Sequence, residues 1–202
     1  NGSQWKGRTI EPFVGGVDGW CQWNLDREPM GRTTTGYYLR KLVDESHDVI
    51  AYSGGVQPLI IMRYAEVLLN KAEACYHLDK TAEANAAVKA VRSRVELPYT
   101  DKAGSDLWDA IRQERKVELA FEGLWYWDLR RWGVAHKQYP EGLTGYQQHG
   151  LKIESNGDGT FTYTYVSVDD NNRHFLEKMY RFPIPSSELT SNSLVNQFPE
   201  WN

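Results

Sequence analysis

Residues 112–133, RQERKVELAFEGLWYWDLRRWG, combine dense charge with dense aromatic rings, and they constrain the fold more than any other stretch. At 3.6 residues per turn, this segment and the residues before it form a helix with one apolar stripe. The members of the stripe are Leu107, Ala110, Ile111, Val117, Phe121 and Leu124. The same spacing places Glu114 and Glu118 inside the stripe, where they face a core.

Carboxylates that face a core need partners, because an unpaired buried charge costs several kcal/mol. One interpretation is a structural clamp, in which Glu114, Glu118 and Glu122 hold arginines where helices meet. The other is a glycoside hydrolase that uses a Glu pair as general acid and base. We favour the clamp, because neighbours on one helix face are about 5 to 6 Å apart and catalytic pairs usually approach a cleft from different elements. The candidate arginines are Arg63, Arg92, Arg130 and Arg131.

Composition limits the class of protein. The chain has 202 residues, the length of one ordinary domain, and 41% hydrophobic residues, enough for a globular core. Its net charge of −4 argues against nucleic acid as a partner.

Cys21 and Cys75 do not form a disulfide framework or a CxxC metal site. The chain has neither an apolar run of 18 residues nor the start of a signal peptide. We therefore expect no membrane-spanning helix, and a mature or excised segment.

Hydrophobic periodicity predicts four helices, at residues 58–78, 81–95, 106–122 and 124–132. The first two match one tetratricopeptide-type unit, which cannot bury its faces as a single copy. Glu73 and His77 are spaced for a metal ion, but two ligands are too few for a closed site. We expect no metal and no cofactor. The fold class is mainly α, with a tetratricopeptide-like helix pair, further helices, irregular loops and a small β-hairpin.

The regions around the helical core differ in character. Residues 1–56 are rich in Gly and aromatics, which indicates loops and short strands. Residues 151–153 and 161–165 alternate around a Gly-containing turn and predict a hairpin. The turn, residues 155–159, resembles part of a calcium loop, but it lacks the terminal Glu that completes such a loop. The prolines of residues 180–185 require an extended tail.

Four stretches together resemble the SusD/RagB family, surface lipoproteins that bind glycans beside a TonB-dependent porin. They are residues 62–74 (MRYAEVLLNKAEA), 114–123 (ERKVELAFEG), 127–133 (WDLRRWG) and 182–185 (FPIP). Residues 37–41 (YYLRK) are similar to the family's strand before the helix pair. The resemblance implies that this helix pair is the fourth tetratricopeptide unit of a longer protein. Three earlier units would lie in an amino-terminal half that this chain does not contain.

The resemblance also implies a domain organisation and a location. Residues 1–202 would form one carboxy-terminal SusD/RagB-like domain, with a loop-rich aromatic segment (1–56), a helical core (57–133) and a final region of loop, hairpin and extended tail (134–202). The protein would be exposed at the surface of the outer membrane. Its lipid anchor would lie outside this chain, because Cys21 does not match the lipidated cysteine.

The implied function is non-catalytic binding of a glycan, an oligosaccharide or starch-like polysaccharide, and its delivery to a TonB-dependent SusC-like porin. We predict Trp5, Trp20 and Trp23 as ligand-binding residues, because rings on loops can stack on a sugar. Each ring could instead plug the protein's own core. The Glu-pair hydrolase remains the alternative function. A peptide-binding tetratricopeptide adaptor is less favoured, because it would have only one unit.

Overall fold

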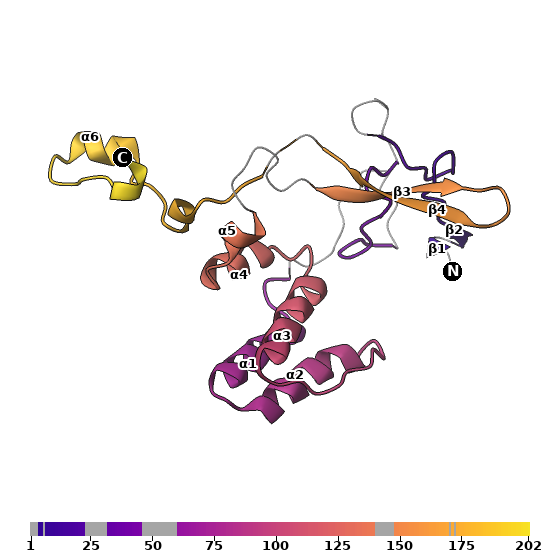
Figure 1. Ribbon diagram of the computed structural model, residues 1–202, viewed down its shortest axis with the longest axis horizontal. Helices are drawn as coiled ribbons and strands as arrows, with labels where there is room; N and C mark the ends of the chain where they lie inside the picture. The colour runs from indigo at the N-terminus through magenta and orange to yellow at the C-terminus, as the bar shows by residue number, and fades with distance from the viewer. Residues whose placement is uncertain are drawn as a thin grey trace. The chain divides into compact units, whose positions relative to one another are not determined.

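The computed structural model in Figure 1 describes residues 4–5, 7–22, 32–45, 60–139, 148–169, 171 and 173–202. These residues fall into two compact units, one from residues 1–40 and 133–202 and the other from residues 41–132. Within the described residues, six α-helices and a two-stranded hairpin are the main elements, which confirms the mainly α fold class. None of the described helices is long and apolar enough to cross a membrane.

The unit of residues 41–132 is helical. Its elements are α1 (Tyr64–His77), α2 (Thr81–Ser93), α3 (Gly104–Glu118) and α4 (Trp125–Arg131). Helices α1 and α2 pack as a pair and α3 contacts both, as Figure 1 shows. The buried side chains where they meet are Ala72, Cys75, Ala84, Ala87, Val88, Leu107 and Ile111. Alanine at several of these contacts allows the helix axes to approach closely.

The predicted helix boundaries were too generous. Helix α1 begins at Tyr64 rather than at residue 58, although residues 58 and 59 lie outside the described residues. Helix α3 ends at Glu118, not at residue 122, and both Phe121 and Gly123 have positive φ angles, of 65° and 77°. A left-handed residue cannot continue a right-handed helix, so the bend expected at Gly123 begins earlier.

This early end corrects the predicted apolar stripe. Phe121 is 71% exposed, because it follows the end of α3 and is no longer held to the face of the helix. Val117 is 61% exposed, because it lies at the margin of the stripe rather than at its centre. Leu119 is buried instead and packs with Leu69 and Val91. The core of the stripe, from Leu107 to Glu118, is otherwise as predicted.

Two cations satisfy the carbonyl groups at the end of α3. The ammonium of Lys41 donates hydrogen bonds of 2.8 Å to the carbonyl oxygens of Glu118 and Ala120. Arg63 Nη2 donates to the same Glu118 oxygen at 2.6 Å. The last carbonyls of a helix have no partner within the helix, and cations are favoured there. These contacts explain why the helix can end where it does.

The other unit contains the strands. β1 (Gln4–Trp5) pairs with β2 (Arg8–Thr9), and β3 (His149–Ser155) forms an antiparallel hairpin with β4 (Phe161–Ser167). The predicted hairpin is therefore confirmed, with longer strands. Its turn is closed by Asp158, whose carboxylate accepts a 2.9 Å hydrogen bond from the Thr160 amide. No group of three or more His, Cys, Asp or Glu side chains in the described ranges could hold a metal ion.

The remaining elements of this unit are short helical turns joined by extended chain. They are α5 (Ala135–Gln138), η2 (Glu177–Tyr180), α6 (Ser186–Ser191) and η3 (Pro199–Trp201). The side-chain amide of Gln197 accepts from the amide of Ile184 and donates to its carbonyl oxygen, both at 3.0 Å. This pair of bonds fixes the proline-rich tail in the extended form that its sequence predicts.

Candidate functional site

The three glutamates of the α3 region are all ion-paired. Arg92 Nη1 lies 2.7 Å from Glu114 Oε2. Arg63 bridges the other two, with contacts of 2.7 Å to Glu118 and 2.8 Å to Glu122. The clamp interpretation therefore has its expected partners in two of the four candidate arginines. Glu118 also pairs with Arg94, which was not among the candidates.

The most deeply buried ion pair among the described residues, between Arg115 and Asp128, was not predicted from the sequence. Arg115 Nε and Nη2 donate to the two carboxylate oxygens of Asp128, at 2.9 and 3.1 Å, and both residues are 4% exposed. Arg115 Nη1 donates to Asn70 Oδ1 at 2.6 Å. Arg131, a candidate partner for the glutamates of α3, pairs instead with Asp128 and Glu73. This network fastens α4 to α1 and α3.

The electrostatics of Glu122 and Glu73 suit a structural clamp better than a catalytic acid. Burial alone would raise the pKa of Glu122, but hydrogen bonds from Arg63 and Lys41 outweigh it, so the pKa is held below its ordinary value. A general acid that works near neutral pH needs a raised pKa. Glu73 has the same character, because the bonds from Arg131 and Trp132 outweigh burial and lower its pKa.

These lowered pKa values predict acid destabilisation. A carboxylate whose folded-state pKa lies below its unfolded value stabilises the fold above the unfolded pKa, about 4.3 for Glu, and loses that contribution as the pH falls through the folded pKa. We expect the free energy of unfolding to decrease as the pH is lowered past about 4.3. In Glu122→Gln, the free energy of unfolding should depend less steeply on pH in this range. Urea unfolding at pH 7 and pH 3 measures it, with the exposed Glu96→Gln as the control. An equal slope in both variants would contradict the assignment.

Trp20 is a partly buried ring with a fixed orientation. Its indole Nε1 donates to the Thr34 carbonyl oxygen at 3.2 Å, and Lys152 Nζ lies 5.7 Å from the ring centroid. A backbone bridge to Thr33 holds the same segment. The ring is therefore anchored at its edge, and only part of its surface is available to solvent.

The other two predicted binding residues are less defined. Trp5 is half-buried and lies on the short strand β1, opposite Arg8. Trp23 lies outside the described residues. Trp5 and Trp20 thus belong to different local structures of one unit. The assignment of all three as ligand-binding residues stays a prediction.

The helix pair with α3 packed against it defines a tetratricopeptide-like helical protein with an added hairpin. The chain belongs to the SusD family, whose model matches residues 1–201. SusD-like protein P2 of Formosa agariphila is 31% identical over 144 residues, which is 66% of this chain and 24% of that protein. SusD-like protein P38 of the same organism is 37% identical over 83 residues, 36% of this chain and 16% of that protein.

Solved structures agree with this membership. BT4246 is 29% identical, with a TM-score of 0.55 over 72% of this chain and 24% of that protein. Its selenomethionine form gives a TM-score of 0.53 over 72% of this chain and 25% of that protein. The chain thus spans about a quarter or less of the length of these relatives.

Proposed function

We propose that this chain is the carboxy-terminal part of a non-enzymatic protein that binds a glycan at the cell surface and delivers it to a TonB-dependent SusC-like porin. The observation that carries the proposal is membership of the SusD family along residues 1–201. The proposed location is the cell-surface side of the outer membrane, and the lipid anchor would lie outside this chain. The ligand class is an oligosaccharide or a starch-like polysaccharide.

The contacts of the helical unit favour this proposal over the hydrolase alternative. Glu114, Glu118 and Glu122 each make an ion pair with an arginine. The carboxylates that a hydrolase would use are therefore occupied by structural ion pairs. Moreover, two of them, Glu118 and Glu122, share the guanidinium of Arg63. A hydrolase would need one carboxyl group free to give its proton to a leaving oxygen.

Isothermal titration of the full-length protein with a panel of oligosaccharides tests the binding function. We expect heat from at least one glycan. Co-purification of the tagged protein from outer membranes tests the partner, and a TonB-dependent porin should accompany it. No heat with any glycan, or a protein recovered alone, would count against the corresponding half of the proposal.

We further propose Trp5, Trp20 and Trp23 as stacking residues for the glycan. Trp20→Ala and Trp5→Ala should each weaken binding by about 1 to 3 kcal/mol, the scale of stacking on aromatic rings. Trp20→Ala should also lower the melting midpoint, because the bond to Thr34 is lost. Titration and thermal melting of each variant separate the two effects. Unchanged affinity in Trp5→Ala, Trp20→Ala and Trp23→Ala would place the site elsewhere.

A further inference from the structure

Strand β4 carries three aromatic rings on one face. Phe161, Tyr163 and Tyr165 occupy alternate positions, and alternate side chains of a strand point to the same side of the sheet. In the register of the hairpin, Tyr163 pairs with Ile153 and Tyr165 with Leu151. The face therefore presents a row of rings beside aliphatic side chains. We call it the tyrosine face.

These rings are exposed although they are large. Tyr163 is 59% and Tyr165 73% exposed, while Leu151 and Ile153 are only half-buried. Successive rings along β4 are about 6.8 Å apart, twice the rise per residue of an antiparallel strand. Such a row can contact consecutive units of an extended chain molecule.

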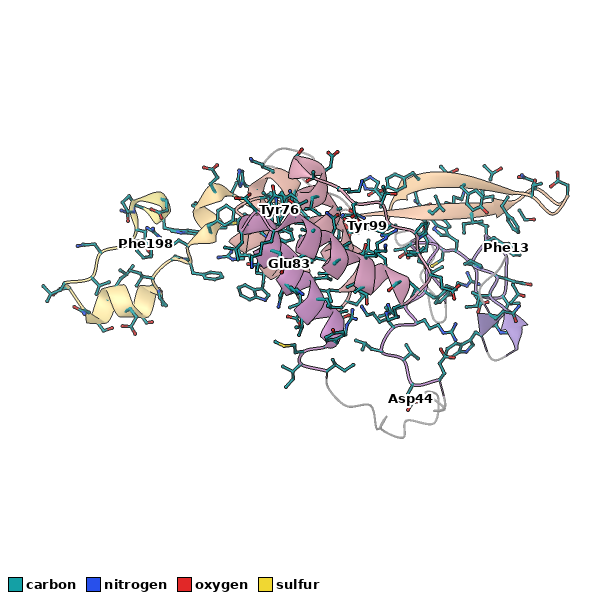
Figure 2. The ribbon with its side chains drawn as sticks, turned by 90° about the horizontal axis from the view of Figure 1, so that it is seen from below. Phe13, Asp44, Tyr76, Glu83, Tyr99 and Phe198 are labelled. Carbon is teal, nitrogen blue, oxygen red and sulfur yellow. The ribbon has the colours of Figure 1, made fainter. Side chains whose placement is uncertain are left out.

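The rings at the two ends of the row, Tyr165 and Phe161, are also held in place by neighbours. The rings of His149 and Tyr165 stack with centroids 4.8 Å apart and planes inclined by only 3°. At the other end of the row, Phe13 lies beside the hairpin in Figure 2, and its ring is 5.5 Å from that of Phe161. Ordered rings lose little entropy when a ligand binds, which favours a recognition surface.

The backbone beneath the rings is braced along the edge of β3. The amide of Val14 donates to the Ile153 carbonyl oxygen, and the amide of Leu151 donates to that of Thr35, both at 2.8 Å. A Cβ at Gly150 would meet the backbone of Thr35, so this close approach requires glycine. The loop segments that contain Val14 and Thr35 thus support the hairpin along the free edge of β3.

Charge decides what the tyrosine face can bind. Lys152 and Glu154 alternate with its residues, lie on the opposite face of the hairpin and pair with each other at 2.8 Å. Lys152 also contacts Trp20, so Trp20 belongs to that opposite face. Among the described hairpin residues on the tyrosine face, His149 is the only ionisable group besides the tyrosines. When an uncharged ligand binds this face, no charged group has to give up its hydration. A polyanion, in contrast, would find no Lys or Arg among these hairpin residues to pair with.

We propose that the tyrosine face is a glycan-stacking surface for uncharged sugar chains, separate from the predicted Trp20 position. Ring faces attract the polarised C–H groups of sugars, and tyrosine hydroxyls can hydrogen-bond to sugar hydroxyls. The inference rests on the proposed glycan-binding function and adds a place and a ligand class to it. The occupant that we propose is a neutral oligosaccharide.

Titration of the full-length protein with neutral hexasaccharides tests the surface, with maltohexaose, cellohexaose, laminarihexaose and xylohexaose as probes. For the probe that binds best, Tyr163→Ala and Tyr165→Ala should each weaken affinity about tenfold. Thr164→Ala, on the opposite face of the same strand, should not change it. Tyr165→Phe should retain most of the affinity, because it keeps the ring. Acidic oligogalacturonate should give less heat than the best neutral probe.

The outcomes separate the surface from the general function. If Tyr163→Ala and Tyr165→Ala both bind the best probe with wild-type affinity, the tyrosine face is overturned and the proposed function stands. If no glycan gives heat with the wild-type protein, both are overturned. Nitration by tetranitromethane gives a measurement without variants. Tyr163 and Tyr165 should react in the free protein and be protected by the best probe. Lack of reaction in the free protein would show that polypeptide covers the face and would overturn the proposal.

Discussion

Replacing Arg115 by methionine is expected to lower the free energy of unfolding by about 3 to 5 kcal/mol, because it leaves Asp128 buried without its main partner. The pair is shielded from water and bonded through two parallel hydrogen bonds. Asn70 loses a hydrogen-bond donor as well. Although Arg131 still contacts Asp128, its side chain is far more exposed and less able to replace a buried guanidinium.

Chemical unfolding of Arg115→Met beside Lys116→Met measures this effect, since Lys116 is the next residue and is exposed. The neighbour should change stability by no more than about 0.5 kcal/mol. The double variant Arg115→Met with Asp128→Leu should recover part of the loss, because no charge is left unpaired. Equal, small effects of Arg115→Met and Lys116→Met would show that water reaches the pair.

Replacing Asn85 by leucine is expected to cost about 2 to 4 kcal/mol, because buried groups left without partners each cost about 1 to 3 kcal/mol. Asn85 is 2% exposed, and its amide makes four hydrogen bonds. Its oxygen accepts from the Tyr99 hydroxyl and the Lys102 amide, and its nitrogen donates to the Thr81 and Lys102 carbonyl oxygens. The side chain therefore joins α2 to the loop before α3.

Urea unfolding of Asn85→Leu and of Lys89→Leu, an exposed position one turn later on α2, separates this role from a general effect on the helix. Lys89→Leu should change stability little. Tyr99→Phe should remove only one of the four bonds and cost correspondingly less, about 1 kcal/mol. If Asn85→Leu is as stable as the wild type, apolar packing has replaced the network.

The order of the helices and the hairpin could be predicted from sequence, because periods of 3.6 and 2 record which faces are buried. The end of α3 could not. It depends on Lys41 and Arg63, which lie 77 and 55 residues away from Glu118 in sequence. No local propensity marks Phe121 as left-handed, since glycine is the usual residue there and Gly123 follows closely.

Ion-pair partners were predicted only in part for the same reason. The stripe showed that Glu114 and Glu118 need cations, but the choice among arginines depends on where α1, α2 and α4 approach α3. Arg115 was overlooked because it lies outside the predicted apolar stripe, beside the exposed Lys116. The signal that could have found it was Asp128, a carboxylate between the apolar residues of a short helix.

The candidate binding residues were the least predictable part. Trp20 was identified by its place in a Gly-rich loop, but only the fold shows that its indole is anchored to Thr34. The tyrosines of β4 were visible as a strand pattern. The exposure of these tyrosines could not be predicted, because alternation alone does not say which face of a hairpin is covered.

The most direct test of the central claim combines binding with the fate of the ligand. The full-length protein is incubated with the oligosaccharide that gives the largest heat of binding, and the recovered sugar is sized by mass spectrometry. Binding followed by recovery of the intact oligosaccharide is the predicted result. Shortened products that are lost in a Glu118→Gln variant whose circular dichroism matches that of the wild type would contradict the account and establish the hydrolase instead.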